Sequence, residues 1–387
     1  VESLDELTRR LDDLLQQAVT PKNSLLDKLR MLPLLAEMSR WLPRTSSSRG
    51  ECQQVVLQGE ASLDALPVLK CWPCDGGRFV TLPLVHTLDP ETGIRNVGMY
   101  RLQLFDARTT GMHWHLHKTG ARHYEGYRRA GRRMPVSVAL GGDPAYTYAA
   151  TAPMPDNMDE YLLAGFLRRR PVKLVKCITN DIYVPADCDF VIEGYVDPSE
   201  PKTVEGPFGD HTGFYSLTDE YPRFHVTAVT RRRDAVYPAT LVGIPPQEDA
   251  YIAKATEKIF LAPIRLAVQP EVKELTMPVS GTAHNLAVVS IDRRYRGQAH
   301  KVAQGLWGAG QMMFNKYLVI MGEDCDVHDP DRLAALLRRA EFPRDLIVSE
   351  GVYDVLDHAT ATPGFGGKLA FDLTEIDPSA SAEAVRL

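Results

Sequence analysis

Ala250-Tyr-Ile-Ala-Lys-Ala-Thr-Glu-Lys-Ile-Phe-Leu-Ala-Pro-Ile-Arg-Leu-Ala267 divides this chain of 387 residues into two parts of different character. Apolar residues such as Ile252 and Ile259 recur in it at the spacing of one helix face. The pair Pro245-Pro246 precedes the stretch and Pro270 follows it, and proline interrupts a helix. The stretch therefore predicts a helix that connects two domains.

The sequence before this helix is rich in short β-forming runs. The runs alternate with turns of Gly, Pro and Asp, which is typical of a sheet-rich barrel or sandwich. One helix, Asp159–Arg168, is expected among them. The expected strands are Arg78–Leu84, Gly98–Phe105, Met112–His117, Val136–Leu140, Val172–Cys177, Phe190–Val196, Phe224–Thr230 and Val236–Val242.

The sequence after the helix alternates between strands and helices, which indicates an α/β layer. Strands are expected over Leu286–Ile291 and Tyr317–Met321, and helices over Gln298–Gly308 and Asp329–Arg339. The glycine-rich segment Gly364–Lys368 lacks the spacing of a P-loop and the Ser or Thr after its lysine, so it is expected to be a mobile loop.

Two helices are expected before any strand. Ser3-Leu-Asp-Glu6 has the pattern of a capping box at a helix start, and a second helix is expected from near Ser24 to Trp41. Helices in this position resemble the end of a larger N-terminal region, and the first residue is Val rather than Met. We therefore expect further residues upstream.

Composition excludes several classes of protein. The net charge of −6 argues against a dedicated nucleic-acid binder, and no apolar stretch approaches the roughly 18 residues that span a bilayer. The six cysteines are sparse and irregularly spaced, which fits a reducing cytoplasm better than a disulfide framework. Cys71-Trp-Pro-Cys74 has redox-like spacing, but the Asp-Gly-Gly that follows favours a turn over a redox or zinc site.

Three segments could carry chemistry. His113, His115 and His117 would share one face of a strand and could bind a metal, or they could form a solvated strand face. Glu205-Gly-Pro-Phe-Gly-Asp210 holds two carboxylates in a turn, which either form an acid–base pair or are simply exposed. The run 117–133 has six Lys and Arg against one Glu and favours a solvated helix, while leaving peripheral membrane association open.

Taken together, these segments resemble the UbiD family of decarboxylases that use prenylated FMN. The resemblance runs from about Leu25 to Asp331 and covers most of the chain. It rests on several motifs in the family's order: Cys71-Trp-Pro, Gly93-Ile-Arg-Asn-Val-Gly-Met-Tyr-Arg101, His113-Trp-His-Leu-His-Lys-Thr-Gly120, Ala139-Leu-Gly-Gly-Asp-Pro144, Glu205-Gly-Pro-Phe-Gly-Asp210 and Pro245-Pro-Gln-Glu-Asp249 to Phe260.

The resemblance implies an α+β fold with a split β-barrel flavin-binding domain, a connecting helix and a smaller α/β C-terminal domain. The corresponding boundaries are residues 1–48 for N-terminal helices, 49–248 for the prenylated-FMN domain, 249–268 for the linker helix and 269–387 for the α/β oligomerisation domain. A homo-oligomer, as a dimer or a trimer of dimers, is expected.

The resemblance also implies a cofactor site. Asn96, His117 and Glu160 match the ligands of a divalent metal, Mn²⁺ or Mg²⁺, that also binds the flavin phosphate. His113 and His115 then have no role. Lys316 matches a lysine that helps to hold the phosphate, and carbonyls around 150–152 match a K⁺ site.

The catalytic set implied by the resemblance is Arg101, Glu205 and Asp210. Many family members have Glu where this chain has Asp210, so the proton donor here is one methylene shorter. His211, directly after it, could contact a phenol hydroxyl of the substrate.

The implied reaction is the non-oxidative, reversible decarboxylation of a hydroxylated benzoic or naphthoic acid, in ubiquinone or menaquinone synthesis. The implied partners are the small aromatic acid and a flavin prenyltransferase that supplies the cofactor, and the implied location is cytoplasmic. Three alternatives remain: another aromatic or acrylic acid as substrate, a metal-dependent hydrolase built on the histidine strand, and a non-catalytic assembly subunit.

Overall fold

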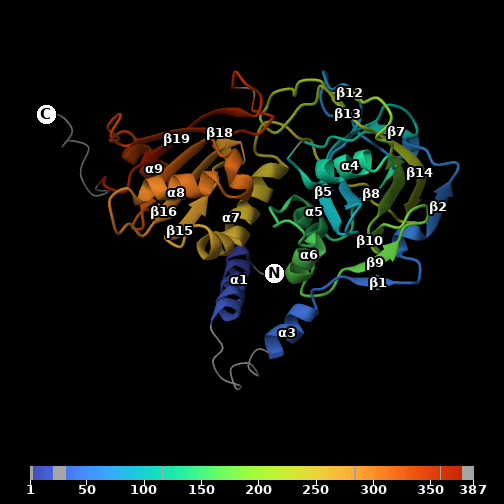
Figure 1. The fold of residues 1–387 in the computed structure, drawn as a ribbon, viewed down its shortest axis with the longest axis horizontal. Coiled ribbons are helices and arrows are strands. Elements are labelled where there is room, and N and C mark those ends of the chain that lie inside the picture. The colour runs from blue at the N-terminus through green and yellow to red at the C-terminus, as the bar shows by residue number, and fades with distance from the viewer. Residues whose placement is uncertain (1–2, 21–31, 116, 283–284, 358, 377–387) are drawn as a thin grey trace. The chain divides into compact units, whose positions relative to one another are not determined.

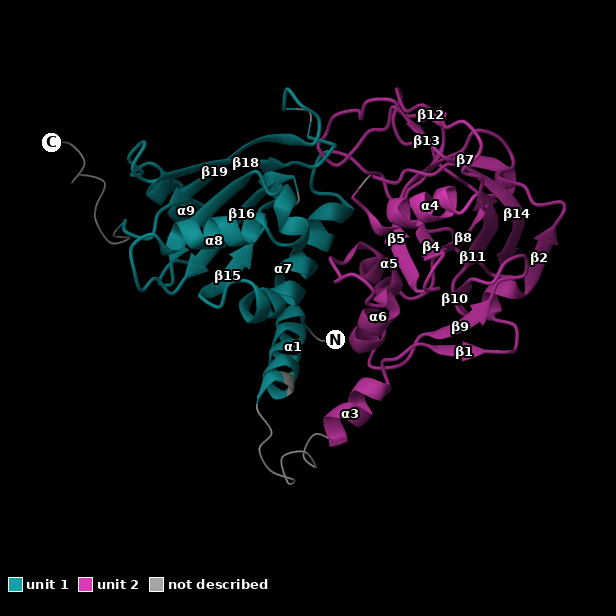
Figure 2. Ribbon diagram, viewed as in Figure 1, with its two compact units in different colours: residues 1–21, 244–387 teal, residues 22–243 magenta. Residues whose placement is uncertain are grey.

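The computed structural model describes residues 3–20, 32–115, 117–282, 285–357 and 359–376. The chain forms two compact units, one of residues 22–243 and one of residues 1–21 with 244–387 (Figures 1 and 2). Both units mix helices and sheets, which confirms the predicted α+β class.

A seven-stranded antiparallel sheet is the centre of the unit formed by residues 22–243. Its strands run in the order β2-β14-β11-β8-β4-β5, and β7 pairs with β14. In β8, Met134, Val136, Val138 and Leu140 alternate onto one face and pack in the main core of this unit, as a strand period of two requires. The strands are β2 (Val55–Gln58), β4 (Leu84–Leu88), β5 (Arg95–Met99), β7 (Thr109–Gly111), β8 (Met134–Leu140), β11 (Phe190–Val196) and β14 (Arg223–Arg231).

Shorter elements surround this sheet. A three-stranded sheet has the order β1-β9-β10, and two-stranded sheets are formed by β3 with β6 and by β12 with β13. Their bounds are β1 (Arg44–Ser46), β3 (Phe79–Val80), β6 (Leu102–Gln103), β9 (Lys173–Lys176), β10 (Tyr183–Pro185), β12 (Thr203–Glu205) and β13 (Asp219–Tyr221). The helices are α3 (Leu32–Ser39), η1 (Glu51–Gln53), η2 (Leu63–Ala65), α4 (Thr119–Arg129), α5 (Pro144–Thr151) and α6 (Glu160–Arg168).

The other unit is built on a five-stranded mixed sheet in the order β15-β16-β17-β19-β18. One face packs against α8 and α7, and the other packs against α9, so this unit has three layers. The strands are β15 (Val272–Thr276), β16 (Leu286–Ile291), β17 (Tyr317–Gly322), β18 (Leu346–Val352) and β19 (Phe365–Asp372). The helices are α1 (Leu4–Val19), α7 (Glu248–Ala267), η3 (Val279–Gly281), α8 (Gln298–Trp307), η4 (Gly310–Phe314) and α9 (Pro330–Leu337).

Helix α1 belongs to the same unit as α7. Its N-cap Ser3 accepts a hydrogen bond from the backbone N–H of Glu6, as the capping pattern predicts. The Thr8 hydroxyl donates to the carbonyl of Lys258, which ties α1 to the middle of α7. Of the second predicted helix, α3 is present from Leu32, and the predicted start near Ser24 lies outside the described residues.

Several local predictions are wrong. The segment 112–115 is not a strand, because the strand β7 ends at Gly111. The segment 236–242 has no strand pairing, since side chains satisfy part of its backbone: the N–H of Val236 donates to Asp189 and that of Thr240 donates to Thr81. Residues 365–368 begin strand β19, where they pair with β18.

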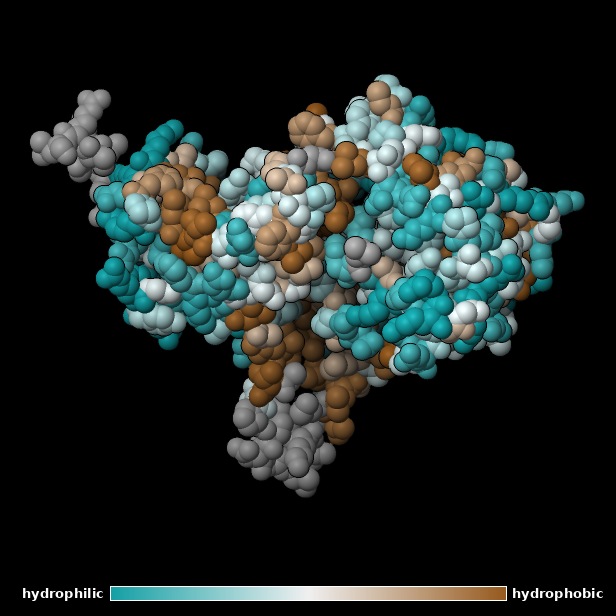
Figure 3. Space-filling view, turned by 45° about the horizontal axis from the view of Figure 1, so that its top comes forward, coloured by the Kyte–Doolittle hydropathy of each residue, from teal (hydrophilic) through white to brown (hydrophobic). Residues whose placement is uncertain are grey.

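The surface in Figure 3 is mostly hydrophilic over the unit formed by residues 22–243. In the other unit, the β18–β19 hairpin exposes apolar side chains, among them Val348 and Phe365. No helix in the described ranges is long and apolar enough to cross a membrane.

Candidate active site

Strand β5 and the residues after it position two of the predicted site residues. Asn96 lies in β5, directly opposite Thr87 of β4. The chain leaves the sheet after Met99, and Arg101 lies in the gap before β6. The predicted continuous strand Gly98–Phe105 is therefore interrupted where Arg101 turns toward the carboxylates of a distant turn.

Arg101 forms a buried ion-pair cluster with both predicted catalytic carboxylates. Its Nε lies 2.9 Å from Oε1 of Glu205 and its Nη2 3.2 Å from Oε2, while its Nη1 lies 2.5 Å from Oδ2 of Asp210. Glu205 is fully buried and Asp210 is 6% exposed. The guanidinium carbon lies 4.6 Å from the ring centroid of Phe208, so the cluster has an aromatic wall.

Each carboxylate also has a histidine beside it. Nδ1 of His113 lies 3.1 Å from Oε2 of Glu205, and Nδ1 of His211 lies 3.1 Å from Oδ1 of Asp210. Nε2 of His113 lies 2.7 Å from Nε2 of His115. His113, to which the resemblance assigns no role, has both ring nitrogens engaged, one of them by Glu205.

The electrostatics of the cluster keep both carboxyls ionised. Burial alone would raise their pKa values, but the hydrogen bond from His113 and the charge of Arg101 outweigh it and lower the pKa of Glu205 to about 2. The hydrogen bond from His211 and the charge of Arg101 likewise lower the pKa of Asp210 to about 2. Burial and the charge of Arg101 lower the pKa of His113, which keeps its ring neutral. The neutral ring therefore donates its one proton, on Nδ1, to Glu205, and Nε2 accepts from His115.

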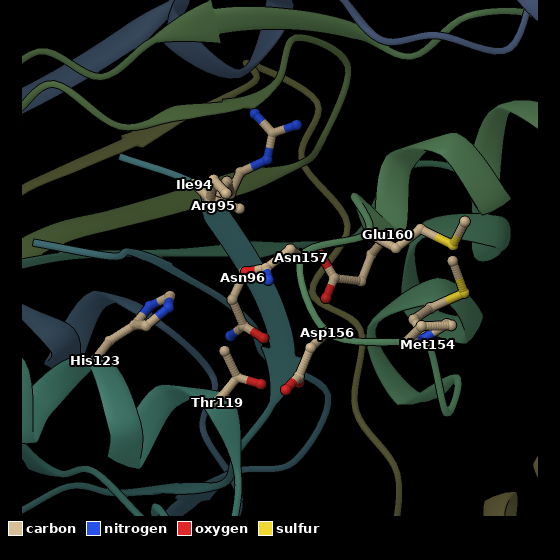
Figure 4. Close-up of a pocket in the computed structure, with 11 residues that line it drawn as sticks. Ile94, Arg95, Asn96, Thr119, His123, Met154, Asp156, Asn157 and Glu160 are labelled. Carbon is tan, nitrogen blue, oxygen red and sulfur yellow. The ribbon is translucent and has the colours of Figure 1, made fainter. Parts of the chain in front are cut away.

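Asn96 and Glu160 line one pocket of the same unit (Figure 4). Thr119, Asp156 and His123 also line it. The N–H of Val97 donates to Oε2 of Glu160 at 3.0 Å, and burial raises the pKa of Glu160 to about 7.

Arg95 also lines this pocket, at the first position of β5. Its Nη2 donates to Asp159, the N-cap of α6, which links the strand to the start of the helix that carries Glu160. Its Nε is buried and has no hydrogen-bond partner in the part of the chain that the structure describes. In Figure 4 the guanidinium of Arg95 points away from Asn96 and Glu160, since successive side chains of a strand point to opposite faces. The pocket itself therefore offers amide and carboxylate oxygens.

The remaining predicted residues lie elsewhere. His117 is exposed in the turn before α4, whereas the pocket is lined by Thr119 and His123 of that helix. Lys316 belongs to the other unit, where its Nζ lies 3.0 Å from Oδ2 of Asp357. No group of three or more His, Cys, Asp and Glu side chains in the described ranges is arranged to hold a metal ion.

The alternative of a hydrolase built on three histidines of one strand face loses its basis. The residues 112–115 do not form a strand, so the alternation that would align the histidines is absent. The Nδ1 and Nε2 of His113 are taken by Glu205 and His115, which leaves that ring no nitrogen for a metal.

The fold and this buried Arg–carboxylate cluster define a class of enzyme, the carboxy-lyases of one family. Residues 44–245 match the family model UbiD, the 3-octaprenyl-4-hydroxybenzoate carboxy-lyase Rift-related domain, and residues 250–373 match its C-terminal domain UbiD_C. The chain belongs to the UbiD family, as the sequence motifs predicted.

Relatives and solved structures agree with this assignment. An uncharacterized protein of Aquifex aeolicus is 46% identical over 374 residues, which is 96% of this chain and 76% of that protein. The UbiD-class enzyme HmfF from Pelotomaculum thermopropionicum, solved with FMN, is 28% identical with a TM-score of 0.78, and the match covers 92% of this chain and 79% of that one. Vanillic acid decarboxylase of Sedimentibacter hydroxybenzoicus, in closed form, is 25% identical with a TM-score of 0.82, over 95% and 80% of the two chains.

Proposed function

We propose that this protein catalyses the reversible, non-oxidative decarboxylation of a hydroxylated benzoic or naphthoic acid with prenylated FMN, in quinone synthesis. The observation that carries the proposal is the buried cluster in which one arginine holds two carboxylates, Glu205 and Asp210, inside a UbiD-family fold. Support for the cofactor comes from HmfF, solved with FMN and, in an evolved dimeric form, with prFMN. Support for the substrate class comes from the vanillic acid decarboxylase.

The pocket beside β5 has the chemistry to hold the flavin phosphate and its metal. The amide oxygen of Asn96 and the carboxylate of Glu160 are hard oxygen donors, which suit Mn²⁺ or Mg²⁺. In the proposal, His117 completes the metal ligands, and carbonyls around 150–152 hold K⁺.

The flavin, when bound, supplies the electron sink that no amino-acid side chain offers for the loss of CO₂ from an aromatic carbon. The protein itself supplies the proton. When the carboxylate leaves as CO₂, the electron pair left on the ring carbon takes a proton, and Asp210 is the proposed donor. Because Arg101 holds Asp210 ionised at neutral pH, the contact between Nη1 and Oδ2 must open for Asp210 to take up the proton it delivers.

Glu205 keeps Arg101 in place while Asp210 moves. Two hydrogen bonds join it to the guanidinium and a third joins it to His113, and the side chain is fully buried. The ring of His211 lies next to Asp210, with Nδ1 at 3.1 Å from Oδ1, and in the proposal this ring contacts a phenol hydroxyl of the substrate.

The further parts of the proposal concern partners. A flavin prenyltransferase would supply the cofactor, and the exposed apolar residues of the β18–β19 hairpin are suited to a homo-oligomer contact. The sparse, irregularly spaced cysteines support a cytoplasmic location, and the net charge of −6 supports the absence of a nucleic-acid partner.

Co-expression with a flavin prenyltransferase tests the cofactor assignment. We expect the protein to be purified with about one modified flavin and one divalent metal ion per chain, because the pocket offers oxygen ligands for the metal. The flavin is measured by absorbance and mass spectrometry, and the metal by elemental analysis. Protein that contains neither after co-expression would contradict the assignment.

A further inference from the structure

Three buried side chains from outside the turn Glu205–Asp210 fix its backbone. The N–H of Gly206 donates to Oε1 of Gln103 at 2.7 Å, and that of Phe208 donates to Oγ of Ser216 at 3.1 Å. The N–H of Gly209 donates to Oδ1 of Asp75 at 2.8 Å. The last of these bonds is made by the residue directly before Asp210.

Asp75 holds two segments together. It is 4% exposed, and its second oxygen, Oδ2, accepts from the N–H of Trp72 at 2.8 Å. The indole N–H of Trp72 donates in turn to the carbonyl of Val242 at 2.6 Å. The stretch Cys71–Asp75, which contains the redox-like cysteine spacing, thus forms the predicted turn. Its hydrogen bonds hold the turn Glu205–Asp210 in place.

The turn is also packed too closely to shift freely. A Cβ added at Gly209 would lie 2.3 Å from Cδ1 of Trp72, so only glycine fits against that ring. The N–H of Gly76 donates to the carbonyl of Pro207 at 2.7 Å, which adds a backbone bond between the two segments.

The short side chain of Asp210 makes this bracing important. An aspartate has two side-chain torsions, so its carboxyl follows the backbone more closely than that of a glutamate, which has three. A shift of the backbone at Gly209 would therefore move the carboxyl of Asp210 away from the reacting carbon. A misplacement of about 1 Å can lower a rate by about a hundredfold.

We propose that Asp75 is a positioning residue for proton donation: its carboxylate fixes the backbone at Gly209 so that the short side chain of Asp210 reaches the carbon that loses CO₂. This inference rests on the proposed function of Asp210.

The test replaces Asp75 by Asn, which keeps the size but exchanges one backbone acceptor for an amide donor. We expect kcat of the flavin-loaded enzyme to fall by about 30-fold or more, with KM within about twofold, because the change affects geometry at the proton donor rather than substrate binding. In the Asp210→Glu background the longer side chain can compensate, and Asp75→Asn should lower kcat less than about fivefold.

Asp189→Asn is the matched control. Asp189 also accepts two backbone N–H groups, those of Gly142 at 2.9 Å and Val236 at 3.0 Å, but it has no link to the catalytic turn. Its replacement should leave kcat unchanged. If both variants lower kcat and thermal stability to the same extent, the effect is general and the proposal is wrong. An equal loss from Asp75→Asn in both backgrounds would also overturn it.

Backbone amide exchange gives a readout that needs no cofactor. In the flavin-free full-length chain, peptides that cover residues 206–213 should exchange at least about tenfold faster in Asp75→Ala than in wild type or Asp189→Ala, because alanine removes the acceptor of the Gly209 N–H. Unchanged exchange in Asp75→Ala would contradict the bracing by Asp75 whatever the activity. Wild-type enzyme that binds flavin but decarboxylates no acid would instead contradict the proposed function.

Discussion

Replacement of Asp210 by Asn is expected to lower the decarboxylation rate by about a thousandfold or more, because an amide cannot deliver the proton that the ring carbon needs and general acid catalysis contributes about that much. The flavin content should stay the same, since Asp210 lies in the cluster with Arg101 and not in the pocket of Asn96 and Glu160. Product formation by the flavin-loaded variant, followed by chromatography, measures the effect.

Two further variants sharpen this result. Glu205→Gln should be similarly inactive, because Arg101 would lose the charged partner that holds it when Asp210 moves. Asp64→Asn is the control, since Asp64 pairs with Arg78 at 2.7 Å in the same unit but at the surface. Exposed pairs contribute little, so its activity should be that of wild type. A rate for Asp210→Asn within about tenfold of wild type would rule out its role as the donor.

Replacement of Glu160 by Gln is expected to lower the bound metal and the bound flavin to about a tenth or less of their wild-type contents. Glutamine keeps an oxygen for the N–H of Val97, so the fold should persist, but it lacks the negative charge that a divalent cation requires. Elemental analysis and flavin absorbance of protein from the co-expression strain measure both contents.

Glu257→Gln is the matched control for this experiment. Glu257 is a buried helical glutamate of the other unit that also accepts one backbone N–H, that of Met277 at 2.7 Å. It should retain full metal and flavin. Full occupancy in Glu160→Gln would show that the pocket beside β5 does not hold the metal.

Strands rich in apolar and β-branched residues could be predicted with the correct bounds. Phe190–Val196 and Leu286–Ile291 have the ends that the sequence predicts, because both are interior strands of buried sheets. Segments whose backbone N–H groups donate to distant side chains could not be predicted correctly. The segment 236–242 has apolar residues suited to a strand, but Asp189 and Thr81 take two of its N–H groups, and no local pattern reveals that.

In the candidate site, too, some residues could be predicted from the sequence and others could not. The motifs predicted that Arg101, Glu205 and Asp210 act together, and the structure brings them within hydrogen-bond distance. They could not reveal His113 or Asp75, because a role that depends on contact across 92 or 134 residues leaves no local spacing. The available sequence signal for these two residues was their polarity beside apolar residues in the sequence. Polar side chains that are buried in a fold form hydrogen bonds.

If the protein releases CO₂ from a hydroxylated aromatic acid, the flavin-loaded wild-type chain turns such an acid over. The measurement incubates this protein with a panel of hydroxybenzoates and dihydroxynaphthoates and follows CO₂ together with the decarboxylated product. We expect at least one acid to give equal amounts of CO₂ and product, and Asp210→Asn to give neither. A fully loaded enzyme that converts none of these acids would contradict the proposed function.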